Sequence, residues 1–435
     1  MGSRKSCKGF RWTMNFYKYG LTSLLCLVLT SCAGGNGGRF GRLIAPPTVV
    51  GKLTAAQLDS ITAQYNLEPL PGAAQCDVTV AQINYVTSGV QPGEVTNSSA
   101  AVLIPSGASC PGPFPLIVFG RATILEKAQA NADLTNPSTQ LVMTFFAAQG
   151  YAVVATDFLG YALSKYPYHP YTHAATEASC MIDSIRAARE ASASLGLKLN
   201  GKIMISGYSQ GGHASMATQR EIEQANSGEF NLVAVASLAG PYNVSGALSY
   251  GATHPIDGVQ SIVPFQIVSY QNIYGNAYAQ TSDVFNPPYD GYIATMFPTL
   301  LSPAAANAML PTGTPAQAQA AMFKTAYLAD LANNPNNTTI VDGKIQDLLA
   351  WNPKSPTILC GGSGDPTVNF KINAQTTYND FISRGVTSVS LVDVDSEIQQ
   401  KYGNLDPVAY NLEYHGALEA PFCLQKAKQS FDLYK

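Results

Sequence analysis

The chain has 435 residues, of which 46% are hydrophobic and only 12% are charged, with a formal net charge of −3. This composition excludes an intrinsically disordered protein, because disordered chains are rich in charge and poor in aromatic residues. It also argues against a nucleic-acid partner, since 25 basic residues face 28 acidic ones and leave no excess to neutralise phosphates.

Residues 1–31 are predicted to be a lipoprotein signal peptide. All five charged residues of this segment are basic, and they precede an apolar stretch at 21–29 that is too short to span a bilayer as a helix. The segment Leu29-Thr-Ser-Cys32 resembles a bacterial lipobox, in which Cys32 becomes the lipidated first residue of the mature protein. A plain signal peptide with an incidental cysteine is the alternative, and Met14 is a plausible second start.

Residues 32–52 are predicted to be a flexible tether, because the run that follows Cys32 is rich in glycine. The signal, the cysteine and the tether together predict an exported bacterial lipoprotein, anchored to a membrane and facing the periplasm or the cell surface. Removal of the basic signal also leaves a mature chain that is more acidic than the whole-chain charge suggests.

The body of the chain alternates predicted strands and helices. A short helix is expected at 53–65, and two strands with alternating apolar and polar residues are expected at 77–88 and 95–105. A helix is expected at 175–193. Short continuous apolar runs, typical of strands buried on both faces of a parallel sheet, follow at 115–119, 151–155, 202–205, 232–236, 357–359 and 388–392. This alternation predicts an α/β fold with a mostly parallel sheet flanked by helices.

Residues 240–352 interrupt this alternation. The segment is rich in Tyr, Pro, Ala, Asn and Gln, and it contains helical pieces such as 317–331. Because a structureless loop of this length is improbable in a compact domain, we expect a partly helical cap or lid inserted over one end of the sheet. The core would then comprise residues 53–239 and 353–435.

Five cysteines remain after the signal peptide and Cys32 are set aside, and export makes disulfides possible. Cys180 lies in an Ala-rich helical stretch and is expected to be a free, buried thiol. Sequence cannot fix the connectivity of the other four, for which we favour Cys76 with Cys110 and Cys360 with Cys423. No Cys or His spacing suggests a metal site, and no cofactor is expected.

The most specific motif is Gly207-Tyr-Ser209-Gln-Gly211, between an apolar strand and a predicted helix. This context is that of a nucleophile elbow, in which the chain turns sharply and lifts the serine hydroxyl above the end of the sheet. Side chains at positions 207 and 211 would collide across such a turn, so glycine is required there. Ser209 is therefore the candidate nucleophile.

A serine nucleophile needs a general base, and in this fold the order along the chain is Ser, then an acid, then His. Asp365 follows an apolar strand and a Gly-rich break, and His415 is the only histidine beyond it. Elimination therefore predicts the triad Ser209, Asp365 and His415. The acids that follow the next strand are rivals of Asp365: Asp393, Asp395 and Glu397.

The other histidines have structural interpretations. His213, in the helix after the elbow, is expected to be packed and hydrogen-bonded, and His169 and His173 are expected to shape the rim of a pocket. The backbone N–H of Gln210 should contribute to an oxyanion hole, with a second N–H from Ala122 or Thr123 in the loop after the strand at 115–119.

These motifs resemble the α/β-hydrolase superfamily and, within it, the secretory-lipase family and its bacterial esterase relatives. The resemblance covers most of residues 76–425, including the segments at 155–161, 239–245 and 351–356. It implies hydrolysis of acyl esters and a helical cap at the insertion. The chain departs from its relatives at Arg121-Ala-Thr123, where they often have His-Gly-Thr. Arg121 adds a charge beside the expected oxyanion hole.

The predicted function is therefore a carboxylesterase or lipase that acts on hydrophobic esters through an acyl-enzyme intermediate. Two alternatives are hydrolysis of amide, polymeric or aryl ester bonds by the same triad, and a surface protein that has kept the fold only for binding. The expected partners are a small-molecule or lipid ester and, through the lipid anchor, a membrane.

Overall fold

The computed structural model describes residues 39–435. The predicted signal peptide and the lipidation site at Cys32 lie outside the described residues. Within residues 39–435, no helix combines the length and apolar character needed to cross a bilayer.

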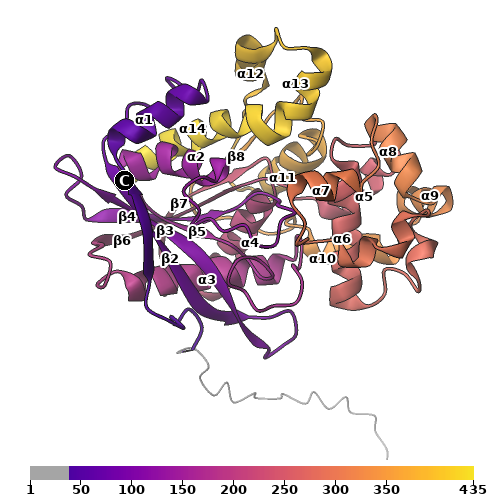
Figure 1. The fold of residues 1–435 in the computed structure, drawn as a ribbon, viewed down its shortest axis with the longest axis horizontal. Helices are drawn as coiled ribbons and strands as arrows, with labels where there is room; N and C mark the ends of the chain where they lie inside the picture. Colours follow the sequence, from indigo (N-terminus) through magenta and orange to yellow (C-terminus); the bar gives the residue numbers. More distant parts are fainter. Residues whose placement is uncertain (1–38) are drawn as a thin grey trace, which may run out of the picture. The chain divides into compact units, whose positions relative to one another are not determined.

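One sheet of nine strands organises the described residues (Figure 1). The pairs along the edge formed by β1, β2, β3 and β5 are antiparallel, and all pairs from β5 through β4 to β9 are parallel. In spatial order the strands are β1 (Thr48–Leu53), β2 (Asp77–Ser88), β3 (Val95–Ser106), β5 (Ala152–Thr156), β4 (Phe114–Gly120), β6 (Leu199–Tyr208), β7 (Asn231–Leu238), β8 (Thr357–Gly361) and β9 (Val389–Asp393). The prediction of a mostly parallel sheet is confirmed.

Two expectations about the antiparallel edge are wrong in detail. β3 was expected to be half-buried but is buried along most of its length, because it lies between β2 and β5 in the interior of the sheet. The predicted tether 32–52 is also too long. The N–H of Gly41 donates to the carbonyl oxygen of Val86, and β1 pairs with β2, so the end of that segment belongs to the folded body.

Helices cover both faces of the sheet (Figure 1). One hydrophobic cluster joins one face to α1 (Ala55–Gln64), α2 (Pro137–Phe145) and α14 (Glu419–Asp432). A second cluster joins the opposite face to α3 (Ala174–Ala191) and α4 (Gln210–Ala225). Both clusters include strand residues that alternate along the parallel core, as expected for a sheet buried on its two sides.

The segment between β7 and β8 is helical and lies beyond the sheet, in the orange region of Figure 1. It has its own cluster of buried apolar residues, among them Phe265, Phe285 and Phe323. Its helices are α5 (Val244–Gly251), α6 (Val259–Tyr274), α7 (Pro303–Ala308), α8 (Pro315–Met322), α9 (Thr325–Asn333) and α10 (Thr338–Gln346).

The single helix expected at 317–331 is wrong, because the chain breaks between α8 and α9. Phe323 has an extended backbone, with φ −111° and ψ 148°, and forms an isolated bridge with Phe285. The two aromatic rings pack with their centroids 5.5 Å apart. Burial of the Phe323 side chain against Phe285 thus outweighs the local preference for a continuous helix.

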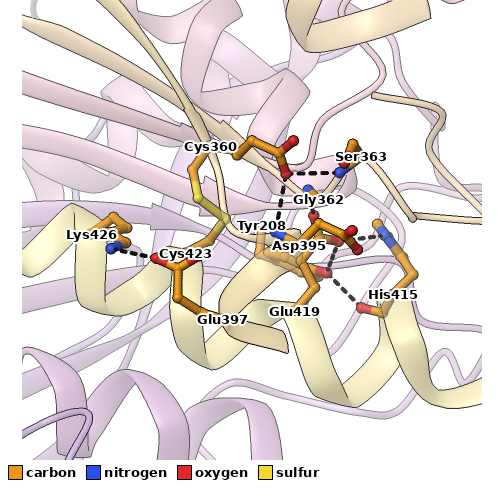
Figure 2. The surroundings of a disulfide bond; sticks show 11 residues. Tyr208, Cys360, Gly362, Ser363, Asp395, Glu397, His415, Glu419, Cys423 and Lys426 are labelled. Carbon is orange, nitrogen blue, oxygen red and sulfur yellow. Dashed lines mark hydrogen bonds and ion pairs between the residues drawn. A yellow bond between two sulfur atoms is a disulfide. The ribbon is translucent and has the colours of Figure 1, made fainter. Parts of the chain in front are cut away.

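Three helices complete the carboxyl-terminal part: α11 (Thr376–Ser383), α12 (Asp395–Tyr402) and α13 (Pro407–Glu413). Both disulfides expected from the sequence are present, Cys76–Cys110 and Cys360–Cys423. Cys180 is a free, buried thiol, as predicted. The second disulfide joins β8 to α14 and therefore ties together the two elements that flank the candidate site (Figure 2).

Candidate active site

Ser209 occupies a sharp turn between β6 and α4. Its backbone angles, φ 58° and ψ −120°, are unfavourable for any residue other than glycine, and such a conformation costs on the order of 1–3 kcal/mol. The neighbouring glycines make the turn possible. A Cβ atom at Gly207 would overlap the carbonyl oxygen of Gly211, and one at Gly211 would overlap that of Gly120. The requirement for glycine is confirmed at both positions, but at 211 the collision is with the end of β4 rather than across the turn.

His415 lies next to Ser209, although 206 residues separate them in the chain. It belongs to the π-helical turn Tyr414–Leu418 between α13 and α14. The Ser209 hydroxyl is positioned to donate to Nε2 of His415 at 2.8 Å, and Nδ1 of His415 donates to Oδ2 of Asp365 at 2.7 Å. The structure thus brings the three residues predicted from the motif order into one hydrogen-bonded series.

Asp365 follows β8. Its Oδ1 accepts the backbone N–H groups of Thr367 and Val368 at 2.8 and 3.1 Å. These two bonds fix the carboxylate, so that Oδ2 faces the imidazole of His415. Burial by itself disfavours the charged imidazolium, but the negative charge of Asp365 and its hydrogen bond raise the pKa of His415.

The three rival acids do not contact His415. Asp393 is exposed at the end of β9 and accepts the backbone N–H of Ser363. Asp395 accepts a hydrogen bond from the hydroxyl of Tyr414, and Glu397 pairs with Lys426. Each of these carboxylates therefore has a local structural partner.

Glu419 is a residue of the site that the sequence reasoning missed. It is fully buried in the first turn of α14, and its Oε2 lies 3.4 Å from Nδ1 of His415. The available signal was its position four residues after the last histidine, a spacing that places two side chains on one helical face.

The residues predicted to form the oxyanion hole lie in two places, at the start of α4 and in the loop after β4. Gln210 is the first residue of α4, where backbone N–H groups lack a partner within the helix and the helix dipole favours negative charge. Ala122 and Thr123 line a cavity that also contains Ser209 and His415. The Thr123 hydroxyl is hydrogen-bonded to the hydroxyl of Tyr171.

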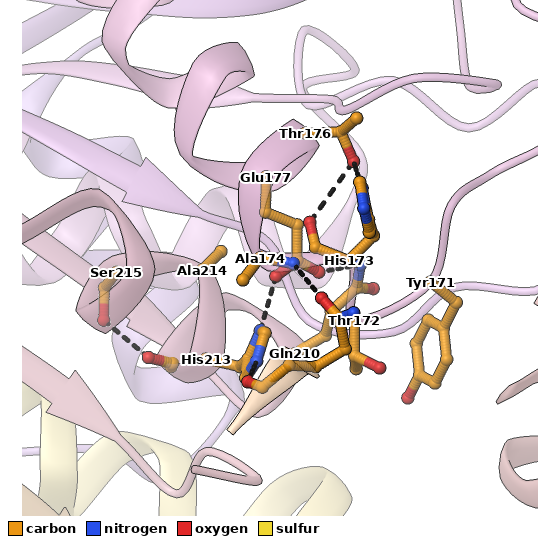
Figure 3. Close-up of polar contacts among 12 residues, drawn as sticks. Tyr171, Thr172, His173, Ala174, Thr176, Glu177, Gln210, His213, Ala214 and Ser215 are labelled. Atoms are coloured by element: carbon orange, nitrogen blue, oxygen red, sulfur yellow. Dashed lines mark hydrogen bonds and ion pairs between the residues drawn. The ribbon is translucent and has the colours of Figure 1, made fainter. Parts of the chain in front are cut away.

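A buried polar network lies behind Gln210 (Figure 3). The Gln210 side chain donates to Oε1 of Glu177 at 2.8 Å and contacts Nε2 of His169 at 2.6 Å. Nδ1 of His213 lies 2.6 Å from Oε2 of Glu177, and its Nε2 lies 3.0 Å from the carbonyl oxygen of Gln346. The structural role predicted for His213 is confirmed, and the network links the elbow to the end of α10.

The pocket-rim position predicted for His169 is wrong. Its ring is only 1% exposed and packs near Phe158, Tyr161 and Phe265. Burial lowers the pKa of His169 to about 3, so the ring is neutral at pH 7. With Nδ1 donating to the carbonyl oxygen of Leu159, Nε2 is left to accept from Gln210, which fixes the side chain of that residue.

Arg121 is buried and faces Asp157 rather than standing unpaired beside the oxyanion loop. Its NH1 group lies 3.4 Å from Asp157 and donates to the carbonyl oxygen of Gln129 at 2.9 Å. The guanidinium also lies over the ring of Tyr161. The positive charge of Arg121 in this loop is thus balanced by the buried carboxylate of Asp157.

Two cavities meet at Ser209. One extends among helices of the segment between β7 and β8 and has a largely apolar lining that includes Val244, Leu248, Val263 and Leu331. The other is lined by His415. Ile262 of α6 also lines both.

Within residues 39–435, Asp365, His415 and Glu419 form the one group of three ligand-type side chains that lie close together. Their polar atoms are engaged with one another and with neighbouring backbone and hydroxyl groups. We therefore treat them as a hydrogen-bonded set rather than as a metal centre.

A parallel sheet with a strained serine at a strand–helix turn, followed in the chain by an acid and a histidine, defines an α/β-hydrolase. Comparison with known proteins agrees. The family model described as "Secretory lipase" matches residues 127–248. The ligand-bound rice cell wall degrading esterase LipA from Xanthomonas oryzae is 34% identical, with 91% of this chain and 99% of that chain covered and a TM-score of 0.81.

The chain belongs to the secretory-lipase family and is thus an ester-hydrolysing α/β-hydrolase. More distant solved structures share the fold. A Legionella pneumophila protein is 20% identical over 90% of this chain and 98% of its own, with a TM-score of 0.77. Candida antarctica lipase A is 16% identical over 86% and 82%, with a TM-score of 0.55. A comparison with curated proteins gave no match.

Proposed function

We propose that the chain is a serine carboxylic-ester hydrolase that cleaves hydrophobic esters with Ser209, His415 and Asp365 as its catalytic triad. The observation that carries the proposal is the series of hydrogen bonds from the Ser209 hydroxyl to His415 and from His415 to Asp365, at 2.8 and 2.7 Å. The strained backbone of Ser209 and the family membership support it.

The reaction follows from this geometry. His415 Nε2 takes the proton of the Ser209 hydroxyl as Oγ attacks the ester carbonyl carbon, and Asp365 stabilises the imidazolium that forms. The N–H of Gln210 and an N–H from Ala122 or Thr123 stabilise the negative oxygen of the tetrahedral intermediate. His415 then returns the proton to the leaving alcohol. Water hydrolyses the acyl-enzyme by the same steps, and no cofactor takes part.

We assign the acyl chain of the substrate to the cavity among the helices between β7 and β8, because its lining is mostly apolar and includes Ser209. A series of p-nitrophenyl esters from acetate to palmitate tests this function. Hydrolysis that improves as the chain lengthens supports it. A protein that cleaves only oligopeptides, or nothing at all, contradicts it.

The substitution Ala247→Phe tests the position of the acyl chain, since Ala247 lines this cavity. A phenyl ring there should displace about three methylene groups, worth about 0.8 kcal/mol each, and lower kcat/KM for long-chain esters by about 30- to 150-fold. Acetate esters should be cleaved normally. Leu141→Phe, in the other cavity, is the matched control; if it alone impairs long chains, the acyl group lies on that side.

The similarity to LipA favours a second candidate substrate, because that relative is described as a rice cell wall degrading esterase. Ester groups carried on a polysaccharide would react at the same serine. Comparison of acid release from ester-substituted polysaccharide and from soluble p-nitrophenyl esters distinguishes the two, since a polymer-directed enzyme should prefer the former.

We further propose that the protein is exported and anchored through a lipid on Cys32. The lipobox-like sequence and membership in a family described as secretory support this proposal. The variant Cys32→Ala should move the protein from the membrane fraction to the soluble exported fraction, because a multiply acylated cysteine supplies the anchor. Continued membrane association of the variant would contradict the proposal.

A further inference from the structure

Glu419 is a second buried carboxyl group beside His415, and the proposed triad does not use it. Its side chain is 0% exposed. Oε1 accepts the backbone N–H of Gly362, while Oε2 lies 3.0 Å from the hydroxyl of Tyr208 and 3.4 Å from Nδ1 of His415. Figure 2 shows Glu419 between Tyr208 and His415, close to the Cys360–Cys423 disulfide.

The protons of the two groups that face Oε2 are both used elsewhere. The single Nδ1 proton of His415 points to Asp365, at 2.7 Å rather than 3.4 Å. The single hydroxyl proton of Tyr208 goes to the carbonyl oxygen of His415, at 2.5 Å rather than 3.0 Å. An ionised Oε2 would therefore face the lone pairs of the Tyr208 oxygen, whereas a protonated Oε2 could donate to that oxygen.

The hydrogen bonds of the two carboxyl groups show which one keeps its charge. Asp365 accepts three donors: the N–H groups of Thr367 and Val368 and Nδ1 of His415. Glu419 has one backbone donor, that of Gly362. Two carboxylates that share a buried site do not both ionise readily, and the better-solvated one keeps its charge. Burial and the charge of Asp365 raise the pKa of Glu419 in agreement with this assignment.

We propose that Glu419 is a positioning residue that carries a proton in the working enzyme and, through Tyr208 and Gly362, holds the Asp365–His415 pair. This inference rests on the proposed triad. A neutral Glu419 leaves a single negative charge beside His415, so that the imidazole is free to accept the Ser209 proton near neutral pH. The ionisable groups that act on Glu419 are Asp365, His415, Tyr208, Tyr242 and Tyr414.

The variant Glu419→Gln tests the proposal because an amide reproduces a protonated carboxyl group, with an oxygen for Gly362 and an N–H for Tyr208. We expect kcat/KM within about threefold of the wild type and the same midpoint of the acid limb of its pH profile, whereas Glu419→Ala should lower kcat at least about tenfold. If Glu419 is instead ionised, Glu419→Gln removes a charge and moves that midpoint down by about one pH unit, which overturns the proposal.

An infrared measurement tests the proton directly and needs no activity. The wild-type minus Glu419→Gln difference spectrum at neutral pH should contain the carbonyl stretch of a protonated carboxylic acid. Its absence overturns the proposal, even if Ser209 proves to be the nucleophile. Conversely, an active Ser209→Ala variant would overturn the triad and leave the infrared result standing.

Glu177→Gln is the matched control, because Glu177 is also a buried carboxyl group but belongs to the separate network around Gln210 and His213. This substitution should leave the Glu419 band in place.

If the Glu419→Gln variant does not fold, the infrared experiment is done with Tyr208→Phe instead. Loss of the Tyr208 hydroxyl should shift the carbonyl band, and an unshifted band counts against the proposal.

Discussion

Ser209→Ala is expected to lower kcat for p-nitrophenyl esters by at least about 10⁴-fold, because it removes the hydroxyl proposed to form the acyl-enzyme. Stability should change little, since the hydroxyl donates only to His415 and the strained backbone of the elbow is held by its glycine contacts. Steady-state kinetics and the thermal unfolding midpoint check the two parts. A fluorophosphonate probe should label the wild type and not the variant.

Ser363→Ala is the control for this experiment. Ser363 is an exposed serine in the loop that leads to Asp365, and the structure shows a hydrogen bond only for its backbone N–H. Its replacement should leave both labelling and turnover unchanged. Turnover by Ser209→Ala above about one per cent of wild type would refute the assignment of the nucleophile.

Asp365→Asn is expected to have the second largest effect, lowering kcat by about 10⁴-fold. An amide at this position presents a donor to Nδ1 of His415 and favours the wrong tautomer, so that Nε2 no longer accepts the Ser209 proton. The bonds from Thr367 and Val368 can persist to the amide oxygen, so the loop should stay folded. Steady-state kinetics of the purified variant measure the loss of activity, and circular dichroism shows whether the variant is folded.

Asp393→Asn is the matched comparison, because Asp393 is exposed after the adjacent strand and only accepts backbone N–H groups. It should retain nearly full activity. The opposite ranking, with Asp393→Asn inactive and Asp365→Asn active, would mean that the acid had been chosen incorrectly. Full activity of both variants would show that Glu419 replaces the aspartate, against the assignment of a neutral Glu419.

The elements of the core could be predicted because their signals are local. β2 begins and ends where the alternation predicted, and the apolar runs form the parallel strands β4 to β9. The signal for the elbow was equally local, since five consecutive residues between a strand and a helix identify it, although Gly120 of β4 also requires the glycine at 211. Both disulfides were expected too, although spacing alone does not fix which cysteines approach one another.

Where prediction failed, contacts between distant residues decided the conformation. Phe323 breaks a helical stretch because Phe285 lies beside it, and Gly41 joins the folded body because Val86 accepts its N–H. His169 is buried rather than at a pocket rim because it packs near Phe265 and contacts Gln210. None of these partners is close in the chain.

The sequence by itself determined the candidates for the reaction: a serine in a sharp strand–helix turn, an acid after a strand, and one histidine beyond it. Only the tertiary structure decided which groups set the charge around that histidine. Glu419 reaches His415 because β8 and α14 pack together, and Arg121 is balanced because Asp157 lies opposite. Chain order can name the residues that react, but the energy of a buried charge depends on every neighbour that the fold brings to it.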